Sequence, residues 1–330
     1  MEHPGLTIAG IIALGAAAQW LAWRINLPAI LPLLITGFLL GPVLGLVTPV
    51  ELVGEKLLFP AVSLAVSLIL FEGGLTLRRQ ELREIGTTVW RLVSVGGLVT
   101  WLIIALAAWL ILGMDLQLAI LLGSLLMVTG PTVIGPLLRI VRPVPRVANT
   151  LKWEGIVIDP IGAMVAALVY TFIVHAQSGN AFSQTLWTFT MFIVVGSIIG
   201  LIAGFGLAYL LRQRRIPDFL VNLISLAFVF VAFAVSNVLV AESGLLATTI
   251  MGIIIANSSI PNFRSILSFK EDLTVLIISV LFIVLAANIE LQTLLSVMNW
   301  QSLLLLAVIM LIARPATIFL SSMGTSFNLN

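Results

Sequence analysis

The chain has 330 residues, of which 60% are hydrophobic and only 9% are charged, and its mean hydropathy is +1.19. A soluble domain carries roughly 25% charged residues, so this composition excludes a soluble protein and indicates one embedded in a lipid bilayer. The net charge of +2 and the lack of a long basic run exclude nucleic acid as a partner, and the absence of cysteine excludes disulfides and thiolate metal sites.

Eleven apolar segments are candidates for transmembrane helices, each of which needs about 20 mainly apolar residues. In chain order they are 6–23, 27–46, 57–76, 92–112, 116–138, 150–173, 187–210, 219–240, 242–256, 272–290 and 300–320. The sequence therefore predicts an all-α, polytopic membrane helix bundle that no soluble domain interrupts.

The basic residues indicate the orientation of these segments, because cytoplasmic loops are enriched in Lys and Arg. With the N-terminus outside, Lys56 falls in an outer loop, Arg314 falls inside a segment, and the inner loops hold 14 of the 16 basic residues. Those fourteen are Arg24, Arg78, Arg79, Arg83, Arg91, Arg139, Arg142, Arg146, Lys152, Arg212, Arg214, Arg215, Arg264 and Lys270. We interpret them as solvated loop charges and assign them no partner.

Small residues predict where helices approach closely. Glycine recurs at every fourth residue from Gly196 to Gly204, a spacing that lets two helices come into close contact. Gly41 and Gly45, on either side of Pro42, lead to the same prediction for the second segment.

The fifth segment contains the sequence "MVTGPTVIG", in which Thr129, Gly130, Pro131 and Thr132 interrupt a helix midway. Irregular backbone at membrane depth is tolerated where it lines a cavity, and the ends of broken helices can hold ions. The sequence therefore predicts a broken fifth helix beside an ion site. A proline kink without a function is the alternative.

Asp159 lies in "KWEGIVIDPIGA", about nine residues into the segment that we expect to start near Thr150. At about 1.5 Å per residue it is roughly 14 Å deep, near the middle of a ~30 Å hydrocarbon core. Pro160 follows it and cannot donate a hydrogen bond to the carbonyl of Ile156. A carboxylate beside such a carbonyl suits a small hard cation. A protonated, hydrogen-bonded structural aspartate is the alternative.

Glu154 lies five residues earlier, which turns the helix by about 140°, so Glu154 and Asp159 face different neighbours and do not share a proton. Arg314, in "IARP", is the one basic residue that we place at membrane depth. We expect it to form a buried structural ion pair with Glu154, because an ionisable group in a membrane is usually paired. Glu72 lies six residues before Arg78, so the inner interface and an ion path are both open to it.

Other function classes find less support in the sequence. No HExxH, GxSxG or glycine-rich phosphate loop occurs, so neither an enzyme nor a cofactor is expected. A passive cation channel would need an uninterrupted polar lining along several helices. A non-transporting membrane sensor or assembly subunit is the second alternative.

The sequences "LFEGGL", "TGPTV", "EGIVIDPIGA" and "IARP", in this order, resemble the NhaP-type sodium/proton antiporters, a family that also contains the animal sodium/hydrogen exchangers. The resemblance implies a thirteen-helix inverted-repeat fold in a homodimer. It also implies exchange of Na⁺ or K⁺ for H⁺ by alternating access across a cell membrane, which we expect to be a bacterial inner membrane.

The resemblance further implies that 1–330 is a single exchanger domain. Its scaffold helices would be roughly 1–77 and 187–290, and its mobile core helices roughly 92–174 and 300–330. The family ends with two more helices, one of them broken, so the sequence leads us to expect a chain that is truncated at its C-terminus.

In the family, the aspartate matching Asp159 binds cation and proton in turn. The threonine matching Thr129 offers a carbonyl, Thr132 belongs to the same motif, and the acid matching Glu72 lies on the ion path. The residues matching Glu154 and Arg314 form a structural pair, in agreement with the interpretation of the charges.

Three residues depart from the family pattern. Gly130 stands where an Asp is usual, Ile158 where an Asn is usual, and Gly155 where a Ser is common. Together with Pro131 and Pro160 they are expected to shape a site that keeps its titratable group and loses side-chain oxygens. The choice between Na⁺ and K⁺ is left open.

Overall fold

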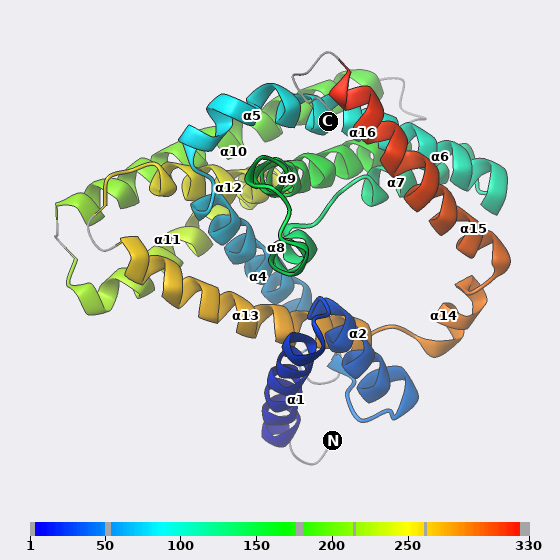
Figure 1. The fold of residues 1–330 in the computed structure, drawn as a ribbon, viewed down its shortest axis with the longest axis horizontal. Helices are drawn as coiled ribbons and strands as arrows, with labels where there is room; N and C mark the ends of the chain where they lie inside the picture. Colours follow the sequence, from blue (N-terminus) through cyan, green and yellow to red (C-terminus); the bar gives the residue numbers. More distant parts are fainter. Residues whose placement is uncertain (1–3, 50–53, 176–180, 214–215, 261–262, 324–330) are drawn as a thin grey trace.

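The structure, a computed structural model, describes residues 4–49, 54–175, 181–213, 216–260 and 263–323. All regular elements in these ranges are helices (Figure 1), so the predicted all-α fold is confirmed. The predicted loop residues Arg214 and Arg215 and the end of the predicted core segment 300–330 lie outside the described residues, as do the side chains of Arg139, Arg264 and Lys270.

The α-helices are α1 (Pro4–Ile25), α2 (Ile30–Phe38), α4 (Glu55–Leu75), α5 (Arg79–Arg91), α6 (Gly97–Leu112), α7 (Leu116–Leu126), α8 (Pro131–Val141), α9 (Pro145–His175), α10 (Ala181–Arg212), α11 (Asp218–Leu239), α12 (Ser243–Ala256), α13 (Phe263–Ala287), α14 (Leu291–Val297), α15 (Trp300–Val308) and α16 (Arg314–Ser322). Three π-helical segments extend or join them. Leu39–Val43 prolongs α2, Leu92–Gly96 joins α5 to α6, and Ile309–Ala313 joins α15 to α16.

The helices have the lengths and composition of a polytopic membrane protein. In the described part of the chain, eight are long and apolar enough to cross a bilayer, and α13 with α14, bent by 82°, would make a ninth. The helices Ile30–Val43 and Ser243–Ala256 are apolar but shorter. At about 1.5 Å per residue they reach roughly 21 Å, less than the ~30 Å of a hydrocarbon core. Together these helices occupy the eleven predicted segments.

Four predicted helix starts, at 92, 150, 187 and 272, are five or more residues too late, because the helices begin at Arg79, Pro145, Ala181 and Phe263. The errors in the fourth and sixth helices moved charges into loops. The fourth helix begins at Arg79, not near 92, because α5 is amphipathic and buries Ile85 and Val89 under a charged outer face. A search for apolar runs misses such a helix. The sixth helix begins at Pro145, not near Thr150, and proline is favoured in the first turn of a helix. The predicted loop charges Arg79, Arg83, Arg91, Arg146 and Lys152 therefore lie on helices.

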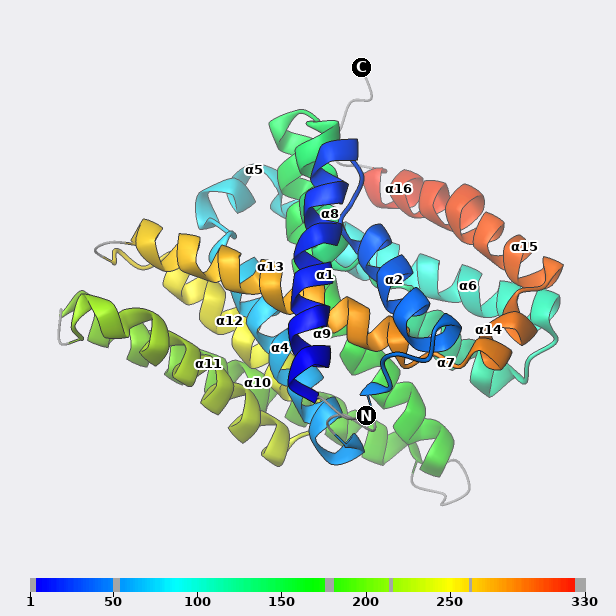
Figure 2. The same ribbon diagram turned by 90° about the horizontal axis from the view of Figure 1, so that it is seen from below.

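Helix α9 occupies the middle of the molecule. Figures 1 and 2 show α10, α11 and α12 on one side of it and α6, α7, α15 and α16 on the other. It packs against α10 and α12 of the first group and against α7 of the second, and it also contacts α5 and α8. Helix α14 carries the chain from α13 across to α15 (Figure 2). α9 is thus the element that borders both groups.

The glycine repeat of α10 makes a close helix–helix contact, as predicted. A Cβ at Gly200 would lie 2.6 Å from the carbonyl oxygen of Ala247 on α12, and at Gly196 or Gly204 it would lie 2.8 Å from the nearest atom of α12. Such distances are too short for a side chain. The α10–α12 contact therefore depends on glycine.

Of the second pair of glycines, Gly41 makes the predicted close helix contact and Gly45 does not. Gly41 packs against the backbone of Ala287 on α13, so its interpretation as a contact residue is confirmed. Gly45 has nothing within 4 Å and a φ of +63°, so its prediction is wrong. It turns the chain after the π-helical segment in a backbone conformation that glycine adopts without strain.

We predict that Gly200→Val destabilises the protein, because the valine must push α12 away from α10. Overpacking of this kind costs about 1–3 kcal/mol and should lower the thermal midpoint measured in detergent. The matched control is Gly206→Val, on the same helix, where a Cβ meets only a ring carbon of Phe228 at 3.8 Å. Equal midpoints for the two variants would contradict the glycine contact.

Candidate functional site

Asp159 lies at the centre of α9. It is the fifteenth of 31 residues in a helix about 46 Å long, so it is near the middle of any bilayer that the helix crosses. Pro160 is part of the same helix, which continues without a break on both sides of it. The predicted depth is therefore unchanged by the corrected helix start, and the effect of Pro160 is limited to the hydrogen bond that it cannot donate.

The face of α9 that carries Asp159 is turned toward the break between α7 and α8. Residues four and three positions apart share a helix face, so Gly155, Asp159 and Gly162 lie in one row. Gly162 packs against the side chain of Val128, and a Cβ at Gly155 would lie 3.1 Å from the carbonyl oxygen of Thr129. Asp159, between these two contacts, therefore faces the segment that separates the two half-helices.

This segment confirms the predicted break in the fifth helix. α7 ends at Leu126, α8 begins at Pro131, and Gly130 between them is extended, with φ −64° and ψ 135°. The end of α7 presents carbonyl groups and the start of α8 presents the positive end of its dipole. Both kinds of polar group occur where an ion can be held at membrane depth.

The carboxylate of Asp159 is half-buried. No described residue makes a hydrogen bond or ion pair with it. A buried carboxylate without a protein partner is costly unless it binds a proton or a cation. Among the described residues, Asp159 therefore lacks the hydrogen bonds that a structural aspartate would make.

Glu154 has the opposite environment on another face of α9. Its side chain is 5% exposed, and its Oε1 accepts a hydrogen bond from the Thr129 hydroxyl at 3.1 Å and lies 3.6 Å from Nη1 of Arg314. The structure thus brings Glu154, Arg314 and Thr129 together. Sequence reasoning assigned the Thr129 carbonyl to the ion site and missed that its hydroxyl holds the structural glutamate.

Arg314 reaches Glu154 from a helix with an irregular turn. The π-helical segment Ile309–Ala313 ends directly before it, and its side chain remains 30% exposed. Thr317, one turn later, is fixed to α6 by a 2.6 Å hydrogen bond between its hydroxyl and that of Thr100. This buried contact holds α16 in the position from which Arg314 meets α9.

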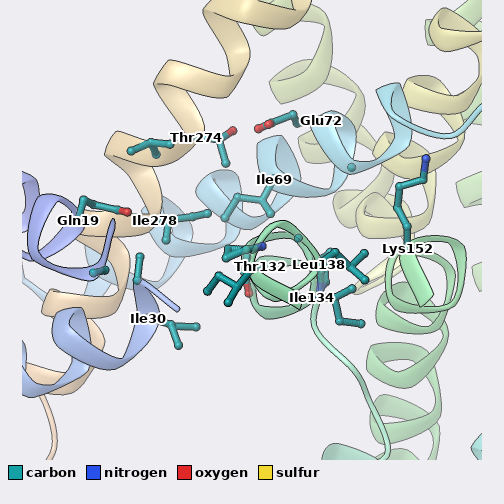
Figure 3. A pocket seen from close by; sticks show the side chains of 18 of the residues that line it. Gln19, Ile30, Ile69, Glu72, Thr132, Ile134, Leu138, Lys152, Thr274 and Ile278 are labelled. Carbon is teal, nitrogen blue, oxygen red and sulfur yellow. The ribbon is translucent and has the colours of Figure 1, made fainter. Parts of the chain in front are cut away.

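A large cavity lies beside the site. It has a volume of about 1240 Å³ and is lined by residues of α1, α2, α4, α8, α9 and α13 (Figure 3). Glu72 and Thr132 are among its lining residues, whereas Asp159 is not. Glu72 is half-buried in the cavity wall, a position that is compatible with the ion path that the sequence left open to it.

One polar cluster at the end of this cavity escaped the sequence analysis. Lys152 lies 2.9 Å from Glu81 of α5 and donates a hydrogen bond to the carbonyl of Thr76 at 3.2 Å. The indole N–H of Trp153 donates a hydrogen bond of 3.1 Å to Glu81 Oε2, the same oxygen that lies 2.9 Å from Lys152. The interpretation of Lys152 as a solvated charge without a partner is therefore wrong. The amphipathic pattern of 79–91 was the signal that could have revealed Glu81.

Comparison with known proteins places this arrangement in a family. The profile described as "Sodium/hydrogen exchanger, transmembrane" matches residues 10–330. The chain belongs to the sodium/hydrogen exchanger family. It is 28% identical over 319 residues to the K(+)/H(+) antiporter NhaP of Alkalimonas amylolytica, covering 96% of this chain and 54% of that protein.

Two further matches come from Methanocaldococcus jannaschii. Na(+)/H(+) antiporter 1 is 27% identical over 325 residues, covering 95% of this chain and 75% of that protein. The structure of the sodium proton antiporter MjNhaP1 at pH 8 matches with a TM-score of 0.86 and 23% identity, covering all of this chain and 83% of that one. The chain thus spans about half the length of the first relative and has the antiporter fold.

The three departures from the exchanger pattern differ in their surroundings. At Gly155 a Cβ would lie 2.6 Å from Cδ1 of Ile134 and 3.1 Å from the carbonyl oxygen of Thr129, so the Ile134 side chain would have to move to admit a Ser. At Gly130 a Cβ would meet nothing nearer than the Thr132 hydroxyl at 3.6 Å, so the backbone there has space for a Cβ. Ile158 is 1% exposed in an apolar cluster with Met127, so the position where an Asn is usual has apolar surroundings in this chain.

We predict that Arg314→Gln lowers the free energy of unfolding by about 2 kcal/mol, because it leaves Glu154 charged and buried. A fully buried pair typically loses about 3–5 kcal/mol, and the partial exposure of Arg314 reduces the effect. Glu154→Gln combined with Arg314→Gln should recover part of the loss. Thermal midpoints in detergent of both single variants and the double variant measure the coupling, and strictly additive losses would contradict the pair.

We also predict that Gly155→Ser destabilises the protein by about 1–3 kcal/mol through overpacking. Ile134→Val removes the one atom, Cδ1, that the new side chain meets first. The double variant should therefore lose less stability than Gly155→Ser alone, although Ile134→Val by itself costs about 0.5–1.5 kcal/mol. A double variant that is less stable than either single variant would show that Ile134 does not exclude the serine.

Proposed function

We propose that this protein exchanges a monovalent cation, Na⁺ or K⁺, for H⁺ across a membrane, with Asp159 as the group that binds both. The observation that carries the proposal is a half-buried carboxylate at the centre of α9, which faces a helix break and has no partner among the described residues. The relatives named K(+)/H(+) and Na(+)/H(+) antiporter support the same activity and both cations.

The chemistry follows from competition for one carboxylate. A proton and a cation cannot occupy Asp159 together, so each must leave before the other binds, and transport of one is coupled to return of the other. The carbonyl of Thr129 and the hydroxyl of Thr132, at the two sides of the break, supply neutral oxygens, and Glu72 attracts cations into the adjoining cavity. Oxygen ligands of this kind suit a hard cation.

Alternating access requires that Asp159 meet each side of the membrane in turn. We assign the roughly defined segments 92–174 and 300–330 to a mobile core and 1–77 and 187–290 to a scaffold. The position of α9 between two groups of helices supports a boundary along this helix. The Glu154–Arg314 pair would then travel with the core, joining α9 to α16 during the movement.

The setting of the protein is part of the same proposal. The distribution of basic residues supports an orientation with the N-terminus outside, and we assign the protein to a bacterial inner membrane. The fold shared with MjNhaP1 supports a homodimer formed through the scaffold. Both assignments can be measured, by labelling of single introduced cysteines from each side of the membrane and by the mass of the purified complex.

We predict that Asp159→Asn abolishes exchange, because the amide neither titrates nor neutralises a cation. Proton movement driven by added Na⁺ and, separately, K⁺ is measured with a pH-sensitive dye in everted membrane vesicles that contain the full-length protein. Asp115→Asn, at the exposed start of α7, is the matched control and should exchange normally.

Two outcomes would contradict the proposal. Undiminished exchange by Asp159→Asn would show that another group carries the ions. A wild-type protein that responds to neither ion, although it is present and folded in the vesicles, would exclude antiport and favour a non-transporting sensor or assembly subunit.

A further inference from the structure

Thr274 of α13 has a hydroxyl group that the fold leaves unsatisfied. The residue is 7% exposed, and its Oγ1 has no hydrogen-bond partner in the described part of the structure. Other helical threonines here donate to the carbonyl four residues earlier, as Thr171 does to Ala167 at 2.8 Å and Thr248 does to Gly244 at 3.0 Å. Thr274 departs from this usual arrangement. A buried hydroxyl without a hydrogen bond is costly unless something else binds it.

The hydroxyl points toward an acid. Figure 3 shows the side chains of Thr274, on α13, and Glu72, on α4, directed toward one another from two walls of the large cavity. The cavity thus brings a carboxylate and a buried hydroxyl oxygen to one place from two helices that pack together. Neither residue is near the other in sequence, so only the fold creates the combination.

The other charged groups of the cavity do not remove this acidic character. Asp272, two residues before Thr274, also lines it and adds a second carboxylate. Of the two basic residues in the lining, Lys152 is held by Glu81 at 2.9 Å, and Arg142 belongs to the end of α8 rather than to the helices that carry Glu72 and Thr274. The region around Thr274 is therefore suited to a cation.

We propose that Glu72 and Thr274 form a cation subsite in the cavity, which a Na⁺ or K⁺ ion occupies on its way to or from Asp159. The carboxylate supplies charge and the hydroxyl supplies a neutral oxygen, and hard cations take such mixed oxygen ligands together with water. The subsite rests on the proposed antiport function. It goes beyond that function in adding a ligand from α13 that the exchange site on α9 does not contain.

The subsite makes a prediction about affinity. Thr274→Val keeps the shape of the side chain and removes the oxygen, so the apparent KM for the cation should rise roughly three- to tenfold, the equivalent of one polar contact. The maximal rate should stay within about twofold, because Asp159 is unchanged. Thr274→Ser restores the hydroxyl and should behave as wild type. All are measured in everted vesicles with the full-length protein.

A control variant separates the loss of the Thr274 hydroxyl from the general effects of replacing a helical threonine by valine. Thr190→Val on α10 removes an exposed hydroxyl that bonds its own helix at 2.9 Å, and it should leave KM unchanged. If Thr274 were merely structural, Thr274→Val would lower the thermal midpoint in detergent, whereas removal of an unsatisfied hydroxyl should leave it equal or raise it. A lowered midpoint with an unchanged KM would overturn the proposal.

A binding measurement distinguishes failure of the subsite from failure of the proposed function. Calorimetric titration of Tl⁺ into the purified Asp159→Asn protein should detect binding that weakens when Thr274→Val is added. Equal binding by the two proteins would overturn the subsite, whatever Asp159 does. Continued exchange by Asp159→Asn would overturn only the role of Asp159. The subsite would still be tested, because the dependence of KM on Thr274 is measured separately.

Discussion

The fold and its site depend on how a lipid-embedded helix carries two carboxylates. Glu154 and Asp159 lie on different faces of α9, so each meets its own surroundings. Glu154 is satisfied by Arg314 and by the Thr129 hydroxyl, and these contacts join α9 to α16 and to the break between α7 and α8. Asp159 faces the same break without a partner among the described residues. One acid therefore joins helices, and the other is the group to which the proposed function assigns the ion.

Much of the fold could be predicted because the bilayer simplifies the problem. Long apolar runs must be helices, since lipid offers no hydrogen bonds to the backbone, and "MVTGPTVIG" breaks one of them where the structure does. The exceptions are places where apolar length is a poor guide. α5 is amphipathic, and the proline at the start of α9 lengthens that helix beyond its apolar part.

The site was less predictable, because its contacts join residues far apart in the chain. The scarcity of charges in the membrane was enough to suggest the partner of Glu154, since only Arg314 was available. No such scarcity pointed to the bond between Glu81 and Trp153, to the role of the Thr129 hydroxyl or to the orientation of Thr274. Likewise, the sequence shows that Gly155 replaces a common serine, but only packing reveals that Ile134 occupies the space.

The two glycines of "LFEGGL" have a mechanical consequence. Gly73 meets the side chain of Ile156 on α9, and Gly74 meets the backbone of α12, so α4 presents bare backbone on both sides next to Glu72. Helices that interlock through large side chains must lift those side chains out of grooves before they can slide. A backbone without side chains has no ridges to clear. Beside Glu72, the surface that α4 turns to α9 therefore lacks side-chain ridges of its own, and a movement of α9 in the proposed alternating access would meet less steric opposition there than between interlocked helices.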